Sequence, residues 1–425
     1  MRNKKRPTFE GYICRTGTTI EPFCEDASDS LIANEPLIET QKRAIRRAGG
    51  TPRQVRAPSE LGPGPAVILF DRVYVSDKLM KDFVKAVDPA APAMLGLARC
   101  ISVEFNLPIQ DVVIEDSGVF YSCFWVPDAS RYAGEPDFLA LESRLKADAG
   151  RVVVKMRELS ASLRLPSLAR QSRVFKFPIT SSVAAHVVHW VTLLRLNSLQ
   201  WGVRWLEYMR GDALGMAQKT VGALASAATV NPYRLMSKIN VVGPDCEIHP
   251  SAYVEASFLG RGVKIGAGAT VRNSFLGDGA VVGDAAYSMS SVLGAESYLT
   301  EGTALIWTVV YPGSSVGNVK IQMSMIGRDT YVGMWCSFLD AKFIGDIMVG
   351  HRGGLVSAGT SFLGSCVGNN CVMGGKVLIM PGRAIPNGTF MVMRPDECIV
   401  EIPEQLPAGV PLIRENGTLV ALRKA

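Results

Sequence analysis

Two short stretches near the N-terminus carry residue types suited to holding a phosphate group. Arg15, Gly17 and Thr18 follow a short apolar run, and Asp71 follows the apolar run Ala66–Phe70. A glycine beside hydroxyl side chains can turn backbone N–H groups toward an anion, although the same residue types also make an ordinary turn. This segment alone leaves both interpretations open. Taken by itself, Asp71 is most simply a residue that caps the turn after its strand.

The stretches around these residues alternate between strand-like and helix-like patterns. Residues 36–50 begin with proline and end with glycine, as helices commonly do, and residues 77–87 form a second helical pattern. The continuous apolar run 66–70 is typical of a buried strand in a parallel sheet. The order predicts a Rossmann-like α/β domain with a parallel sheet over residues 1–180. Ligands of such sheets bind at the carboxyl ends of the strands, where both stretches fall.

The C-terminal part contains a repeat. Residues 239–399 hold 25 of the 41 glycines. Aliphatic or aromatic residues recur there at five- or six-residue spacing: Val242, Ile248, Val254, Leu259, Ile265, Val271, Leu276, Val282, Tyr287 and Val292. This spacing predicts a short strand and a tight turn in each hexad, with the recurring residue pointing inward. Three hexads make a triangular turn of about 18 residues, so roughly nine turns are expected.

The repeat over 239–399 resembles the left-handed parallel β-helix of hexapeptide-repeat transferases, a family with both structural and catalytic members. The pattern weakens between Trp307 and Phe338, where seven aromatic or methionine side chains crowd together: Trp307, Tyr311, Met323, Met325, Tyr331, Met334 and Trp335. Such a cluster could line a ligand groove. The general prevalence of packing roles favours an enlarged turn or a subunit contact instead.

Three pieces of the N-terminal part resemble the sugar-phosphate nucleotidyltransferases. They are CRTGTTIEPF (14–23), NEPLIETQKRAIRRAG (34–49) and ILFDRVYVSDKLM (68–80). The family opens with a glycine-rich loop, continues with a P-L-I-E helix, and has a strand that ends in a glycine–aspartate pair. A trailing β-helix is typical of its bifunctional members, so the domain order agrees with the resemblance as well.

The resemblance implies that Gly17 and Thr18 cradle the phosphates of a nucleotide and that Asp71 binds Mg²⁺. The family's first loop glycine is here Arg15, its catalytic arginine is Thr19, and residues 25–31 contain three carboxylates and no lysine. Each lost charge contact is worth ~2–4 kcal/mol of transition-state stabilisation, so the usual nucleotidyl transfer is expected to be impaired. Arg15 could supply a relocated cation.

The histidines offer a second chemistry. Hexapeptide acyltransferases use a histidine as general base, and His351, in a glycine-flanked segment, is the candidate for that role here. His186 and His189 could share one helix face and a metal, but a core or capping role is favoured because no third ligand is evident. We expect the apolar run 177–194 to be a buried helix. Residues 181–238 are expected to form a helical connector, and residues 400–425 a tail.

Composition sets the remaining expectations. The net charge of +6 lies in residues 1–238, with 32 basic and 24 acidic residues, and no nucleic-acid-binding motif accompanies it. The nine cysteines contain no close pair, and no apolar run reads as a membrane span, so a cytoplasmic location is expected. The main expectation is an Mg²⁺-dependent nucleotidyltransferase that acts on a sugar 1-phosphate, with a nucleotide or nucleotide-sugar as its ligand. The alternatives are an acyltransferase that uses the β-helix and a non-catalytic scaffold that binds such a ligand. A homotrimer through the flat β-helix faces is expected in each case.

Overall fold

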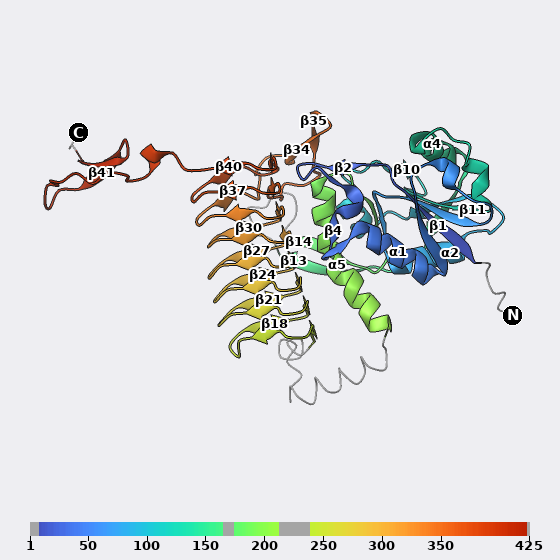
Figure 1. Cartoon of the computed structure of the whole chain (residues 1–425), viewed down its shortest axis with the longest axis horizontal. Helices are drawn as coiled ribbons and strands as arrows, with labels where there is room; N and C mark the ends of the chain where they lie inside the picture. Colours follow the sequence, from blue (N-terminus) through green and yellow to red (C-terminus); the bar gives the residue numbers. More distant parts are fainter. Residues whose placement is uncertain (1–7, 165–173, 212–238, 423–425) are drawn as a thin grey trace.

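The computed structural model describes residues 8–164, 174–211 and 239–422. Figure 1 shows an α/β domain beside a tall triangular prism, with the long helix α5 (Trp190–Gly211) between them. The last described residues leave the top of the prism as an extended arm that ends in the hairpin of β41 (Leu412–Glu415) and β42 (Thr418–Ala421). Among the described helices, none is both long and apolar enough to cross a bilayer. The fold is an α/β domain followed by a left-handed parallel β-helix.

The central sheet of the N-terminal domain has seven strands. Its order is β12 (Gly150–Val154), β9 (Ala93–Leu97), β11 (Gly118–Val126), β7 (Ala66–Phe70), β1 (Phe9–Cys14) and β6 (Gly50–Val55), with β10 (Val113–Glu115) attached to β11. Strands β6, β1 and β7 are parallel to one another, as are β9 and β12. Strand β11 runs antiparallel to both of its neighbours, β7 and β9. The sheet is therefore mixed, and the prediction of a parallel sheet holds for its two flanks only.

The predicted helices of this domain are confirmed. Helix α1 (Leu37–Ala48) begins directly after Pro36 and ends at Gly49, whose φ of 96° lies in the left-handed region that glycine tolerates. Helix α2 (Asp77–Ala86) packs against α1. Two further helices follow, the short α3 (Ile101–Asn106) and α4 (Phe138–Asp148). Apolar faces of these helices and both faces of the sheet form one continuous core.

The apolar run 177–194 is not a single helix, and that prediction is wrong. Its start belongs to β14 (Val174–Ile179), which pairs with β13 (Leu159–Arg164). Its middle contains β15 (Ala184–His186), which pairs with β8 (Val73–Val75), and α5 begins only at Trp190. His186 and His189 both precede the helix and so share no helix face. Of the predicted connector, residues 212–238 lie outside the described residues.

Strands of the β-helix stack into three parallel sheets. The first contains β16 (Val241–Val242), β19 (Phe258–Leu259), β22 (Phe275–Leu276), β25 (Val292–Leu293), β28 (Val309–Val310), β31 (Met325–Ile326), β36 (Cys366–Val367) and β39 (Ala384–Ile385). The second contains β17 (Glu247–Ile248), β20 (Lys264–Ile265), β23 (Val281–Val282), β26 (Tyr298–Leu299), β29 (Ser315–Val316), β32 (Tyr331–Val332), β37 (Val372–Met373) and β40 (Phe390–Met391). The third contains β18 (Tyr253–Glu255), β21 (Thr270–Arg272), β24 (Tyr287–Met289), β27 (Ala304–Ile306) and β30 (Lys320–Gln322), and β33 (Ser337–Phe338) and β38 (Leu378–Ile379) pair separately.

Successive coils are mostly 17 residues apart, as in the bond from the Arg261 N–H to Asp278 one coil further on. The first and second sheets have eight strands each, so the described prism has about eight coils where roughly nine were expected. A run of buried hydroxyl residues, including Ser257, Ser274, Ser291 and Thr308, follows the same spacing. In this run the hydroxyl of one coil accepts the N–H of the next. These bonds satisfy buried backbone donors at one corner of the prism.

The predicted inward residues from Val254 to Val282 are buried inside the prism. Tyr287 is wrong as an inward residue, because the adjacent Ser288 takes that position and bonds the hydroxyl of Ser274. The prediction for Val292 is off by one position. Leu293 points into the prism, and Val292 packs on the outside of the prism. Val242 and Ile248 stay exposed because no described coil covers the first one.

The interruption of the repeat lies later than expected. Coils continue through 307–338, and the insertion follows them. The N–H of Arg328 bonds Asn369, which is 41 positions further on, whereas successive regular coils are about 17 positions apart. The insertion contains the hairpin of β34 (Met348–His351) and β35 (Gly354–Ser357). Four members of the predicted aromatic cluster, Trp307, Tyr311, Met323 and Met325, contact the N-terminal part of the chain, while the remaining three, Tyr331, Met334 and Trp335, are exposed. The cluster is mostly an interdomain surface.

Candidate functional site

The loop Arg15–Thr18 and Asp71 lie together because β1 and β7 are adjacent parallel strands. Cys14 and Phe70, the last residues of the two strands, are paired in the sheet register. The chain segments that follow therefore leave the same edge of the sheet, as the sequence predicts.

Asp71 bonds the loop itself. One carboxylate oxygen accepts the hydroxyl of Thr16 at 2.6 Å, and the other accepts the N–H groups of Thr16 at 2.7 Å and of Gly17 at 3.3 Å. Only 1% of Asp71 is exposed. Burial raises the pKa of its carboxyl group above the ordinary value, and the three bonds from the loop oppose that rise. Asp71 thus holds the loop in a closed conformation. The N–H and hydroxyl donors of the loop point toward the carboxylate of Asp71.

The cation of the loop, Arg15, is paired with a carboxylate. Arg15 donates to Asp26 at 2.8 Å, and both side chains remain partly exposed. They line an open hollow of about 660 Å³ together with four further residues, Gly17, Gln54, Arg56 and Glu60. Two arginines face two carboxylates there, so the hollow carries no net positive charge. Thr18 lies beside it and shares a 2.9 Å hydrogen bond with the hydroxyl of Thr16.

A magnesium ion prefers octahedral oxygen ligands, usually one or two carboxylates completed by water and phosphate. Both oxygens of Asp71 are engaged by the loop, and the nearby Asp26 is paired with Arg15. The residues present therefore do not fit Mg²⁺, and no metal-dependent step follows from this geometry.

The segment after the loop packs on the β-helix. Phe23 stacks on Tyr311, with ring centroids 5.3 Å apart. Glu25 accepts from Arg328 at 2.8 Å and from the amide of Asn369 at 2.9 Å. The Tyr311 hydroxyl in turn accepts the N–H of Leu31 at 3.1 Å. This acidic segment therefore docks the N-terminal domain on the β-helix.

Sequence reasoning missed this role. The residues that Glu25 contacts lie more than 300 positions away along the chain. No local pattern links partners at that separation. The acidic character of 25–31 was the available signal, and it indicated only a loss of cations.

His351 lies at the junction of the domains, not on a flat face of the prism. The insertion hairpin that carries it reaches the N-terminal domain, where Arg352 pairs with Asp111. The ring of His351 meets that of His189 edge-on at 5.3 Å, and His189 donates from Nε2 to the carbonyl of Gly350 at 3.0 Å. Burial and the neighbouring Arg352 lower the pKa of His351. Burial lowers the pKa of His189 to about 4, so both rings are neutral at pH 7.

The remaining histidine of interest, His186, is buried in the N-terminal domain. Its Nε2 accepts the N–H of Ser122 at 2.9 Å. Burial lowers the pKa of His186 to about 3. A core role, favoured from the sequence, agrees with these contacts.

Comparison with known proteins identifies no family for this chain. No protein-family model matches it, and no curated protein does. Among solved structures, one similar chain is a point mutant of perosamine N-acetyltransferase from Caulobacter crescentus, solved in complex with CoA and GDP-perosamine. The identity is 17% and the TM-score 0.17, and the match covers 33% of this chain. It spans about half of that acetyltransferase (52%), and a likeness of this size carries no functional argument.

Proposed function

We propose that this chain is a nucleotidyltransferase-like protein that binds a nucleotide or nucleotide-sugar without nucleotidyl transfer. In this proposal the hollow beside Arg15, Gly17 and Thr18 receives the ligand. The β-helix serves as a rigid scaffold that assembles three copies.

One observation carries the proposal: the loop that would cradle phosphates is closed onto Asp71 by three hydrogen bonds. A triphosphate needs free N–H donors and uncompensated cations at this place. Here Arg15 is neutralised by Asp26, and the next segment is committed to the β-helix. Two missing cations at ~2–4 kcal/mol each correspond to a rate loss of several orders of magnitude.

Ligand binding is retained in the proposal because the hollow is wide and its guanidinium groups are accessible. Its volume of about 660 Å³ lies within the roughly 300–1,000 Å³ of small-molecule sites. Arg56 is exposed at its rim and can meet a phosphate as a fork of two N–H groups.

The test separates binding from turnover. Purified protein is titrated calorimetrically with nucleotides and nucleotide-sugars, and pyrophosphate release is followed with nucleoside triphosphates, Mg²⁺ and sugar 1-phosphates. We expect saturable binding that weakens about tenfold in Arg56→Ala and not in the control Arg53→Ala, an exposed arginine of the same neighbourhood outside the hollow. Pyrophosphate release that is lost in Asp71→Ala would overturn the non-catalytic assignment. If none of the nucleotides and nucleotide-sugars binds, the proposed class of ligand is wrong.

Acyl transfer is the second candidate, supported by the state of His351. A general base must be unprotonated at working pH, and the lowered pKa of this partly exposed ring meets that requirement. The test is acyl-CoA consumption with amino-sugar nucleotides as acceptors. Loss of activity in His351→Ala, with activity kept in His249→Ala, supports the candidate. Consumption that is unchanged in His351→Ala removes His351 from the mechanism.

The trimer is proposed to form through the second sheet. Its outward column becomes apolar toward the C-terminal coils, where Tyr331, Val372 and Phe390 are exposed. Large exposed apolar patches are typical of association surfaces. Light scattering should give three times the 45.8 kDa chain mass, and Tyr331→Glu should lower it. A wild-type mass of one chain contradicts the trimer.

A further inference from the structure

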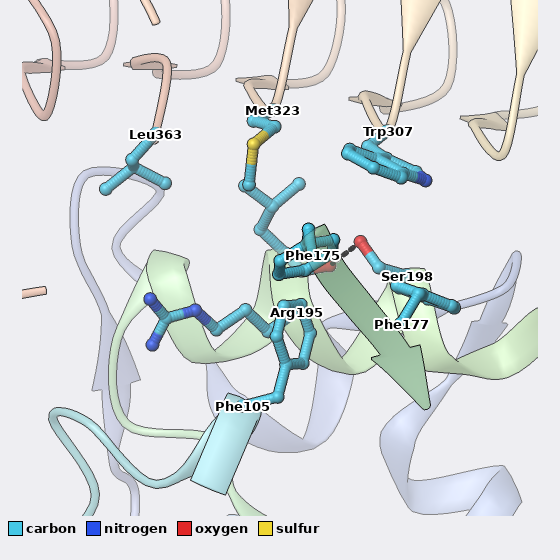
Figure 2. A pocket seen from close by; sticks show the side chains of 9 residues that line it. Phe105, Phe175, Phe177, Arg195, Ser198, Trp307, Met323 and Leu363 are labelled. Atoms are coloured by element: carbon cyan, nitrogen blue, oxygen red, sulfur yellow. Dashed lines mark hydrogen bonds between the residues drawn. The ribbon is translucent and has the colours of Figure 1, made fainter. Parts of the chain in front are cut away.

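A second hollow lies between the N-terminal domain, helix α5 and the β-helix (Figure 2). Its walls are almost entirely apolar and come from all three parts: Phe105, Phe175, Phe177, Leu194, Arg195, Ser198, Trp307, Met323 and Leu363. Trp307 stacks on Phe177 at 5.9 Å across the domain boundary. Figure 2 shows Trp307, Met323 and Leu363 reaching down from the β-helix toward the rings below.

Arg195 is the one charged residue of this wall. Its side chain crosses the front of α5 and lies over the ring of Phe105 at 5.7 Å. It is 5% exposed, and its Nη2 donates to the carbonyl of Ala358 at 2.5 Å. Its Nη1 has no hydrogen-bond partner, and no carboxylate pairs with it among residues 8–164, 174–211 and 239–422. Burial alone lowers the pKa of this guanidinium to about 10.

A buried cation without a counter-charge is unfavourable and is rarely left uncompensated. The buried guanidinium of Arg195, with Nη1 unpartnered beside the hollow, points to an anion as its counter-charge.

We propose that the hollow binds a small monovalent anion of chloride size, held by Nη1 of Arg195. The hollow is narrow and accommodates little more than a water-sized guest, which excludes a nucleotide or a sugar. One partnerless N–H group beside apolar walls favours a single charge, because a divalent anion loses far more hydration energy on burial. The edges of aromatic rings carry a partial positive potential and are therefore compatible with an anion.

The bound anion would stabilise the contact between three elements: helix α5, the insertion and helix α3. Arg195 belongs to α5, its second N–H group bonds Ala358 of the insertion, and Phe105 belongs to α3. Binding at this point therefore stabilises the position of the N-terminal domain on the β-helix. Stabilisation by a ligand that binds only the folded chain grows with the logarithm of its concentration.

Thermal unfolding of the full chain tests the proposal. Sodium chloride is exchanged for sodium gluconate at constant ionic strength, since gluconate is too large for the hollow. We expect a midpoint roughly 1–3 °C higher in chloride. Arg195→Met should abolish this difference, and the exposed control Arg261→Met should keep it. Equal midpoints in the two salts, or a chloride effect that persists in Arg195→Met, would overturn the proposal.

Crystals soaked in bromide give a second measurement that needs no variant. An anomalous peak within hydrogen-bond distance of Arg195 Nη1 supports the site. A well-ordered water in that position, with no anomalous signal, contradicts it. Because the nucleotide-binding hollow lies elsewhere, this outcome is independent of the proposed function.

Discussion

Replacing Asp71 separates its two possible roles, a metal ligand and a clasp for the loop. In Asp71→Ala, the N–H groups of Thr16 and Gly17 lose their acceptor, whereas the Thr16 hydroxyl can still bond the hydroxyl of Thr18. Gly17 is exposed and can bond water instead, whereas Thr16 is half-buried. For the one orphaned donor of Thr16 we expect a loss of roughly 1–3 kcal/mol in the free energy of unfolding.

Asparagine is the informative second variant. An amide can accept the two N–H groups with its oxygen and donate to the Thr16 hydroxyl with its nitrogen, so only the charge is lost. We therefore expect Asp71→Asn to lose about 1 kcal/mol, the difference between charge-assisted and neutral hydrogen bonds.

The assay is urea unfolding followed by far-UV circular dichroism, in EDTA and again in 10 mM Mg²⁺, a concentration of roughly the order used for weak carboxylate sites. The control is Asp29→Ala, an exposed carboxylate of the following segment, which should change stability by less than about 0.5 kcal/mol. The loop-stabilising role of Asp71 is refuted if Asp71→Ala is as stable as the wild type in EDTA. Stabilisation by Mg²⁺ in the wild type but not in Asp71→Asn would assign the metal role instead.

Three further predictions concern the framework. Burial would raise the pKa of Glu142, but Arg72 and hydrogen bonds from Ser122 and Lys146 bring it down to about 2, so stability from this group is present above pH 4.5 and is lost as the pH falls toward 2. Glu142→Gln should remove this part of the acid dependence, and an unchanged pH profile of unfolding contradicts it. Phe23→Ala should destabilise the domain junction by ~3–4 kcal/mol in denaturant melts, whereas a loss below about 1 kcal/mol would mean that the ring stack is not structural. Ser274→Ala should cost ~1–2 kcal/mol, measured the same way, and no change would show that its hydroxyl bonds are dispensable.

The β-helix could be predicted because its signal is local. In each coil the inward-pointing residues recur every five or six positions, as Leu259, Ile265 and Val271 do. This short spacing reveals the period without knowledge of distant contacts. The pattern failed where the inward residue is polar, at Ser288, because hydrophobicity was the quantity being followed. The position of the insertion after Phe338 was also missed: the crowding of aromatic residues that was followed lies in regular coils, and the hairpin comes later.

Helices α1 and α2 and strand β7 were predictable from capping residues and apolar runs. The direction of β11 was not, because a strand buried on both faces has the same composition in either orientation. Residues 177–194 illustrate the same ambiguity: a continuous apolar run fits a buried helix or consecutive buried strands equally well by composition.

The meeting of the loop with Asp71 followed from sheet topology, but the use of their polar groups did not. Whether an aspartate binds a metal or bonds its own loop depends on distances of a few tenths of an ångström. Arg195 gave no local signal either, since an arginine within a helical apolar pattern is usually expected to reach solvent.

The altered loop and the domain junction are two aspects of one arrangement. In a phosphate-binding enzyme, the segment after the glycine loop must bring cations to the nucleotide and adjust as it binds. Here Phe23 and Glu25 fix that segment to Tyr311 and Arg328 of the β-helix. A cation at position 25 would face Arg328 across the junction and repel it, so the same position cannot serve both purposes. The contacts of Glu25 thus commit this segment to docking, which agrees with the proposed non-catalytic role.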